Sequence, residues 1–144
     1  MDLPRNSTLF VSEKRDSDSR GEILSIVDQP IQNVSIITST PGALRSNHYH
    51  HKDFHFMYVY EGEIDYFYKD VDTNKTNYIK VKQGDNIFTP KSEVHAAYFS
   101  KKTTLIVSSK HPRDQETYEA DTVRIKFISH ENVKEMIDKF EKQK

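Results

Sequence analysis

The stretch NHYHHKDFHFMYVYEG, residues 47–62, decides how the rest of this sequence is interpreted. It carries histidines at His48, His50, His51 and His55, and its second half is rich in aromatic and β-branched residues, which favour strands. Alternate residues of a strand share a face, so His48 and His50 point the same way, about 7 Å apart. Two ligands of one metal ion have this reach. The stretch therefore predicts a strand that carries part of a metal site.

Two further histidines complete the predicted site. His55 follows a turn-prone HKD segment, where a bend re-aims the next strand toward the same interior point. His95 begins a later strand, with Ala97 and Phe99 on the same face. Three or four neutral imidazoles around an ion such as Zn, Fe, Ni or Mn leave positions open for water or substrate. The remaining histidines are expected outside the site: His51, His111 and His130.

The composition of the whole chain excludes several classes of protein. The 144 residues suit one domain, and 21 basic residues scattered among 22 acidic ones give a net charge of −1. This distribution speaks against a nucleic-acid partner. Cysteine is absent, which removes disulfides and thiolate chemistry. No stretch approaches a membrane span and no leader is visible, so we expect a soluble, cytoplasmic protein.

Short runs rich in Ile, Val, Tyr, Phe and Thr, separated by turn residues, predict an all-β fold from residue 21 onward. Without long helical segments between them, such strands form a closed barrel or a double-sheet jelly roll. The ten predicted strands are residues 22–28, 34–40, 44–49, 54–60, 63–69, 78–82, 86–89, 94–100, 103–109 and 122–128.

The two ends of the chain are expected to flank the barrel. Residues 1–20 are polar and are predicted to form an N-terminal arm, followed by the barrel at 21–128. Residues 129–144 are predicted to form one amphipathic helix, with Ser129 as its N-cap. Residues 110–121 are predicted to be a loop near a barrel mouth or an edge. The apolar stripe of the helix, at i, i+3, i+4 and i+7, consists of Val133, Met136, Ile137 and Phe140.

The chain resembles the cupins, through two motifs that lie between Gly42 and His95. The first motif is a glycine, five residues, His-x-His, a glutamate and a closing glycine; His55 stands in the place of the glutamate. The second runs from a glycine through a proline and a further glycine to a histidine, and Ser92 stands in the place of that further glycine. The matched positions are Gly42, His48, His50, His55, Gly62, Gly84, Pro90, Ser92 and His95.

The resemblance implies a double-stranded β-helix, the RmlC-like jelly roll, with a divalent metal inside and often a homodimer. With His55 in place of a carboxylate, the site has four histidines and no compensating negative charge. Such a site favours an anionic ligand or an enolate-like intermediate. The segments RSNHYH (45–50) and DSRGEI (18–23) also look like stretches of small cupins from bacterial polysaccharide and sugar-nucleotide biosynthesis clusters.

These similarities lead to three hypotheses about function. In the first, an isomerase or epimerase moves a proton next to the ketone of a sugar or sugar nucleotide. Arg45 would bind phosphate, and Tyr66, Tyr68 and Tyr98 are the candidate catalytic tyrosines. In the second, the histidines hold Fe(II) for a dioxygenase-type reaction. In the third, the chain is a non-catalytic cupin that binds a small molecule or a metal.

Overall fold

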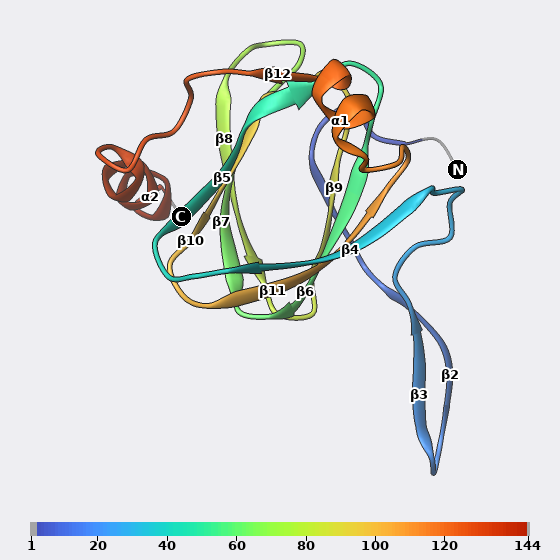
Figure 1. Ribbon diagram of the computed structural model, residues 1–144. Helices are drawn as coiled ribbons and strands as arrows, with labels where there is room; N and C mark the ends of the chain where they lie inside the picture. The colour runs from blue at the N-terminus through green and yellow to red at the C-terminus, as the bar shows by residue number, and fades with distance from the viewer. Residues whose placement is uncertain (1–2, 144) are drawn as a thin grey trace.

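The computed structural model describes residues 3–143, which form two facing sheets, a separate hairpin and two helices (Figure 1). One sheet has the order β1 (Thr8–Phe10), β9 (Asn86–Thr89), β6 (His55–Glu61), β11 (Thr103–Ser109) and β4 (Asn33–Ser39). The other has the order β12 (Thr122–Arg124), β5 (Ala43–His50), β10 (His95–Phe99), β7 (Glu63–Lys69) and β8 (Thr76–Lys82). Every paired strand is antiparallel.

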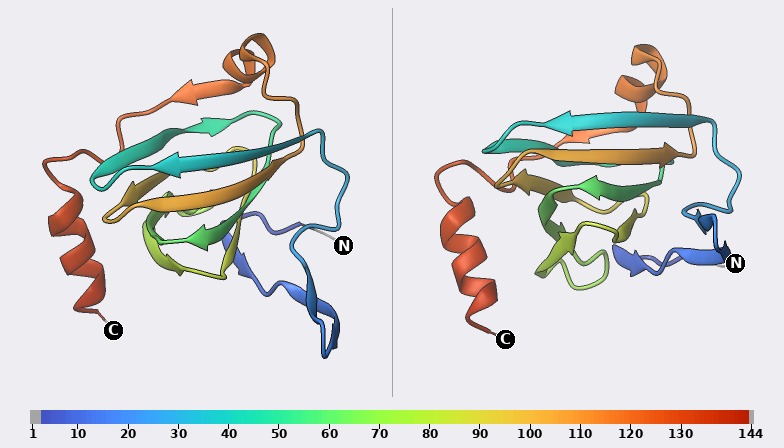
Figure 2. Two further views of the ribbon diagram at one scale, coloured as in Figure 1. Left: turned by 60° about the horizontal axis from the view of Figure 1, so that its bottom comes forward. Right: turned by 90° about the horizontal axis from the view of Figure 1, so that it is seen from below.

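The hydrophobic core lies between these two sheets, and the right view of Figure 2 looks onto the outside of the one that runs from β4 (cyan) to β1 (blue). Alternate residues of each strand point into it, as the period of a strand requires. The predicted double-sheet jelly roll is confirmed, and nine of the ten predicted strands overlap barrel strands. The buried members of this core are Met57, Val59, Ile64, Tyr66, Val81, Ile87, Ala97, Phe99, Leu105 and Val107.

A second apolar cluster covers the outer face of the sheet that contains β5, β10 and β7. There α2 (Val133–Glu141) packs its predicted stripe against Phe67, Ala96 and Tyr98. The helix begins later than predicted, because its N-cap is Asn132. Ser129 N–H donates to Asn132 Oδ1 at 2.9 Å and Ser129 Oγ accepts from Asn132 N–H at 3.2 Å, which closes a separate turn before the helix.

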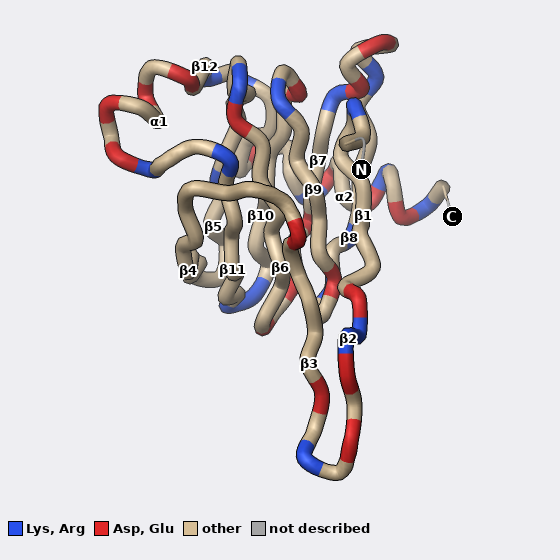
Figure 3. Tube along the Cα trace, turned by 90° about the vertical axis from the view of Figure 1, so that its right-hand side faces the viewer, with Lys and Arg blue, Asp and Glu red and all other residues tan. Residues whose placement is uncertain are grey.

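The predicted strand at residues 22–28 is not part of the barrel. Its first residues form β3 (Gly21–Ser25), which pairs with β2 (Glu13–Asp18) in a two-stranded hairpin. This hairpin projects from the barrel and carries charges of both signs, as Figures 1 and 3 show. The tenth barrel strand is instead β1, which pairs with β9 at the edge of its sheet.

The segment predicted as a loop near the barrel mouth contains α1 (Gln115–Asp121). Asp114 caps this short helix by accepting from Thr117 N–H at 3.0 Å, a local interaction typical of a helix start. The helix lies beside β12 at one end of the barrel (Figure 1). Neither helix within residues 3–143 is long and apolar enough to cross a membrane.

Candidate functional site

Four buried histidines converge inside the barrel at the end near α1. His48 and His50 come from β5, His95 from the neighbouring β10, and His55 from β6 of the facing sheet. One ligand nitrogen of each of His48, His50 and His95 lies within 4.8 Å of the others. The ring centroid of His55 lies 5.6 Å from that of His95 and 6.0 Å from that of His50. The structure thus brings together all four histidines expected from the sequence.

A β-bulge in β5 directs His48 and His50 inward. In the pairing with β10, Ser46 lies opposite Ala96 and His48 lies opposite His95, so Asn47 has no partner opposite it. Ser46 and Asn47 both have positive φ values, of 72° and 55°. The side-chain amide of Asn47 holds it in this position. Its Nδ2 donates to the carbonyl oxygen of Ile128 at 3.0 Å, and its Oδ1 accepts from the N–H of Ile128 at 2.9 Å. Because the bulge inserts one residue, it reverses the alternation of side chains along the strand.

Burial keeps these imidazoles neutral. It is the largest cause that lowers the pKa of His48 to about 2 and that of His95 to about 4, and neighbouring histidines lower both further. The pKa of His50 is also lowered by burial, and that of His55 falls well below its ordinary value for the same reason. Neutral imidazoles offer bare nitrogen lone pairs, so the cluster can bind a metal ion or accept a proton.

Hydrogen bonds fix which nitrogens of the cluster are free. His95 Nδ1 donates to the carbonyl oxygen of Glu93 at 3.0 Å, which leaves Nε2 without its proton. Within residues 3–143, buried His95 Nε2 and His55 Nδ1 have no hydrogen-bond partner. A buried nitrogen without a partner is costly, so these two atoms fit a site completed by a ligand.

His50 is oriented from behind by residues at the end of α1. Its Nδ1 lies 3.2 Å from Thr122 Oγ1 and 3.8 Å from Asp121 Oδ2. Thr122 Oγ1 donates its own proton to the carbonyl of Tyr118 at 2.6 Å, so it accepts from Nδ1 of His50. This arrangement places the proton on Nδ1 and leaves Nε2 of His50 as the free base.

A cavity of about 120 Å³ opens beside the histidines. His48 and His55 line it together with Arg45, Arg113 and Tyr118, and no carboxylate is among its lining residues. The Arg113 guanidinium lies 5.1 Å from the centre of the Tyr118 ring, and its buried Nε has no hydrogen-bond partner within residues 3–143. The cavity therefore combines neutral bases with two positive groups at its border.

The three candidate tyrosines occupy different environments. Tyr66 is fully buried in the core, where its hydroxyl bonds Ser7 Oγ at 2.6 Å and Thr89 Oγ1 at 2.7 Å. Half-buried Tyr68 lies on the same inner face, with ring centroids 6.2 Å apart. Tyr98 points the other way, into the cluster beneath α2, because its parity on β10 is opposite to that of His95.

Two residues of the cavity escaped sequence reasoning, Arg113 and Tyr118. Both belong to the segment predicted as a loop, and Tyr118 lies on α1 with its ring centroid 5.5 Å from that of His50. Burial raises the pKa of the Tyr118 hydroxyl. The helix could have been anticipated from Asp114, since an aspartate followed by three helix-compatible residues is an N-cap signal. Its placement over the barrel end has no signal in the sequence.

Comparisons with known proteins point to one family and one fold. The family model described as the polysaccharide biosynthesis C-terminal domain matches residues 16–123. No curated protein sequence matches the chain.

Solved structures of sugar-nucleotide enzymes share the fold at low identity. QdtA, a sugar 3,4-ketoisomerase from Thermoanaerobacterium thermosaccharolyticum solved with TDP, is 18% identical, with a TM-score of 0.68 and coverage of 98% of both chains. A 3,4-ketoisomerase from Helicobacter canadensis is 15% identical, with a TM-score of 0.68 over 84% of this chain and 92% of the other. The dTDP-4-dehydrorhamnose 3,5-epimerase from Sulfolobus tokodaii is 14% identical, with a TM-score of 0.67 over 88% and 81%. These neighbours identify the fold as the RmlC-like cupin jelly roll.

Proposed function

Because the chain belongs to the polysaccharide biosynthesis C-terminal domain family, we propose that it binds a nucleotide-linked keto sugar and transfers a proton at the carbon beside the ketone. The observation that carries this proposal is the set of four buried, neutral imidazoles, two of which, His48 and His55, line a small cavity together with two arginines. The shared fold supports the substrate class, since a mutant of QdtA was crystallised with TDP-4-keto-6-deoxyglucose.

His50 is the proposed general base. Its free Nε2 takes the proton from the carbon beside the ketone, and the electron pair of the broken C–H bond forms an enediolate. The imidazolium that results is stabilised from behind by Asp121, whose carboxylate lies 3.8 Å from Nδ1. An acid on the opposite face then gives a proton to the same carbon, as in an epimerase. In a ketoisomerase a proton goes to the former carbonyl carbon, while the neighbouring hydroxyl loses its proton and becomes the ketone and the former carbonyl oxygen gains one and becomes the hydroxyl.

Arg45 and Arg113 are the proposed contacts for the diphosphate. The Arg45 guanidinium is oriented by hydrogen bonds from Nε to Ser39 Oγ at 2.8 Å and from Nη2 to the carbonyl of Thr38 at 2.9 Å. The side chain is otherwise exposed and lines the cavity. A guanidinium matches the geometry of phosphate oxygens, and no acidic side chain at the cavity competes for it.

Tyr118 is the proposed hydroxyl partner of His50 in the reaction. It lines the cavity, whereas Tyr66 has both hydroxyl contacts taken within the core and Tyr98 lies on the outer face of the sheet. A tyrosine hydroxyl at the cavity can donate or accept the second proton. Half-buried Tyr68 remains a candidate for a contact deeper on the inner wall.

The residues present also fit a divalent metal ion. His48, His50 and His95 would hold it, with His55 as a fourth ligand, because buried nitrogens of His55 and His95 have no other partner within residues 3–143. Borderline-soft imidazole donors suit Zn, Fe, Ni and, less well, Mn. A bound ion would supply Lewis acidity at the ketone oxygen, and His50, as one of its ligands, would then not serve as the base. With Fe(II), the same ligand set is the basis of the dioxygenase alternative, for which iron content and oxygen uptake are the tests.

A homodimer is the proposed assembly. Within residues 3–143, the exposed large apolar side chains fall on three parts of the chain: the N-terminal segment and β1, the β2–β3 hairpin, and the outer face of the sheet that contains β4 and β6. A hairpin of two strands is marginally stable alone in water, so a second copy that covers it would stabilise it. These side chains are Leu9, Val11, Ile23, Leu24, Val34, Ile36 and Tyr60.

Solvent-deuterium incorporation tests the proposed reaction directly. The protein is incubated with TDP-4-keto-6-deoxyglucose in D₂O, and exchange at the carbons beside the ketone is followed by NMR. We expect incorporation with the native chain, its loss in His50→Asn, and its retention in the matched control His51→Asn, because His51 is exposed. Binding of the nucleotide sugar without any incorporation would contradict the enzyme proposal and favour a non-catalytic binding module.

A further inference from the structure

Glu93 is a buried carboxyl group with an unusual partner. Its exposed fraction is 0%, and burial raises its pKa to about 7. Both carboxyl oxygens accept from one residue, Ser7, whose N–H lies 2.6 Å from Oε2 and whose hydroxyl donates to Oε1. Burying a carboxyl group is costly, so a carboxyl group whose side-chain partner within residues 3–143 is one serine indicates that the position of the serine matters.

Ser7 is brought to this place by a firmly attached stretch of the N-terminal segment. The side chain of Asn6 donates to Asp70 Oδ2 at 2.9 Å and accepts from Val71 N–H at 3.0 Å. On the other side of Ser7, β1 pairs with β9. Ser7 is itself only 5% exposed. The N-terminal segment therefore inserts one hydroxyl group into the barrel, far in sequence from every histidine of the site.

The hydroxyl of Ser7 reaches the inner wall of the histidine site through Tyr66. Ser7 Oγ lies 2.6 Å from Tyr66 Oη, which also contacts Thr89 Oγ1 at 2.7 Å. The ring of Tyr66 is nearly parallel to the imidazole of His95, with an angle of 13° and centroids 6.2 Å apart. Tyr66 thus forms a wall beside His95, and its hydroxyl is used to hold that wall in place.

Glu93 holds His95 by a second route as well. Its backbone carbonyl accepts from His95 Nδ1 at 3.0 Å. The side chain and the backbone of one residue therefore act on the same imidazole, the first through Ser7 and Tyr66 and the second directly. His95 Nε2, which has no partner within residues 3–143, takes its direction from both.

We propose that Ser7 and Glu93 are positioning residues of the histidine site: together they fix Tyr66 against His95 and so set the direction of His95 Nε2. The proposal rests on the proposed function, because it gives His95 a role toward a ligand or substrate. It also changes the role expected for Tyr66 from a proton carrier to a support. Orientation of groups in a site is worth large rate factors, since small displacements of reacting groups slow the reaction strongly.

The test compares Ser7→Ala with Thr103→Val. Thr103 is a fitting control because it is fully buried and its hydroxyl bonds two carbonyl groups, yet it lies at the opposite end of β11 from the histidines. In metal-free protein, the exchange rate of the His95 Nδ1 proton with solvent is measured by NMR. We expect it to rise about tenfold or more in Ser7→Ala and to stay unchanged in Thr103→Val.

The kinetic readout separates positioning from binding. In the deuterium-incorporation assay, Ser7→Ala should lower kcat about tenfold to a hundredfold with little change in KM, and Ser7→Thr, which keeps the hydroxyl, should restore most of it. Equal behaviour of Ser7→Ala and Thr103→Val in both readouts would overturn the proposal. If Ser7→Ala does not fold, Glu93→Gln is judged by the same two readouts. The proton-exchange readout needs no turnover, so it tests the positioning role even if the proposed reaction is wrong.

Discussion

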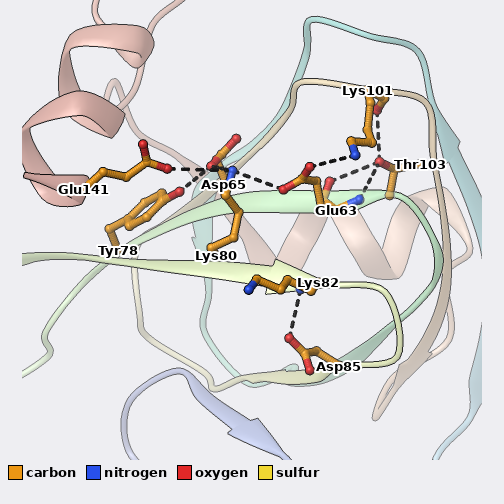
Figure 4. Close-up of polar contacts among 9 residues, drawn as sticks. All are labelled: Glu63, Asp65, Tyr78, Lys80, Lys82, Asp85, Lys101, Thr103 and Glu141. Atoms are coloured by element: carbon orange, nitrogen blue, oxygen red, sulfur yellow. Dashed lines mark hydrogen bonds and ion pairs between the residues drawn. The ribbon is translucent and has the colours of Figure 1, made fainter. Parts of the chain in front are cut away.

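Two polar clusters border the same sheet and have opposite characters. Against its inner face, four histidines lie close together, two of them line a cavity, and two of their buried nitrogens lack partners within residues 3–143. On its outer face, Lys80 joins Glu63 at 3.1 Å and Asp65 at 2.8 Å, as Figure 4 shows. Tyr78 donates to the same Asp65 carboxylate, and Glu141 of α2 lies 4.0 Å from the Lys80 ammonium.

This difference indicates that the Lys80 cluster stabilises the fold and that the histidine cluster serves function. In the Lys80 cluster every charge faces an opposite charge or a donor, and the cluster links β7 and β8 to α2. In the histidine cluster the groups are alike, and they gain nothing from one another, since neighbouring histidines lower the pKa of His48, His55 and His95. Polar groups that do not satisfy each other inside a protein indicate an external partner.

The largest expected effect is on the reaction, from His50→Gln. Removing the base should lower kcat/KM about a thousandfold, equivalent to about 4 kcal/mol of transition-state stabilisation. The glutamine amide can still contact Thr122, so the urea unfolding midpoint should change far less than the rate. Kinetics and urea unfolding on the same preparation check this. A parallel loss of activity and of stability would place His50 with the structural residues instead.

The second largest effect is on stability, from Lys80→Met, which should leave the reaction unchanged. Asp65, which is 1% exposed, would lose its cation, and we expect a loss of about 3 kcal/mol in the free energy of unfolding. Deuterium incorporation should be unchanged, because the cluster lies outside the barrel. The control is Lys101→Met, whose side chain is 60% exposed and pairs with Glu63, and which should cost about 0.5 kcal/mol or less. Equal losses of unfolding free energy in Lys80→Met and Lys101→Met would contradict the structural role given to the Lys80 cluster.

A change of pH should affect the two clusters differently. The histidine pKa values are lower in the folded state than the ordinary value of 6.5, so the unfolded chain takes up more protons as the pH falls below that value. Stability contributed by neutral histidines is therefore complete above pH 6.5 and is lost as the pH falls toward about 4, where His95 titrates in the folded state. Glu93 and Asp53, whose pKa values are raised by burial, act in the opposite direction and offset part of this loss.

The four histidines outnumber these two carboxyl groups, so metal-free protein should lose about 2 kcal/mol or more between pH 7.5 and pH 5. Urea unfolding at both values, after treatment with a chelator, measures this loss. The same measurement with saturating Zn²⁺ should show higher stability at pH 7.5, because an ion that binds only the folded state stabilises it. A midpoint that does not move between pH 7.5 and pH 5 would mean that the imidazoles are not neutral in the folded protein.

The smallest of these effects concerns the border of the cavity. Arg113→Met keeps much of the packing on Tyr118 and removes the charge, so KM for the nucleotide sugar should rise about tenfold, or about 1.4 kcal/mol, with kcat little changed. Steady-state kinetics measure this change. The matched control is Arg124→Met, since Arg124 is exposed and already paired with Glu119 at 2.8 Å. A larger KM effect in Arg124→Met would move the proposed anion contact away from the cavity.

Local pattern predicted the elements of the site, and long-range packing decided its surroundings. The separation of His48 and His50 and the face shared by His95 and Ala97 followed from strand geometry alone. The bulge at Asn47 did not, because a positive φ at a non-glycine residue depends on the contacts of that residue with Ile128. Which face of the sheet each side chain of β5 occupies therefore could not be predicted from the sequence.

The errors have the same origin. Residues 22–28 have the composition of a barrel strand, yet β1 occupies the edge beside β9 and leaves β3 in the hairpin. Tyr98 looked equivalent to Tyr66 and Tyr68 as a candidate, but the alternation along β10 puts it under α2. Ser7 and Tyr118 lie far in sequence from the histidines, and only the folded chain shows that they border the site.

The most direct test of the account is the protonation state of the histidine cluster in metal-free protein. Imidazole ¹⁵N chemical shifts, measured by NMR at pH 6, distinguish neutral rings from charged ones. We predict that His48, His50, His55 and His95 are all neutral at that pH, and that His95 and His50 carry their single proton on Nδ1. Two or more of these rings in the charged imidazolium form would contradict the account, because it requires all four buried imidazoles to be neutral.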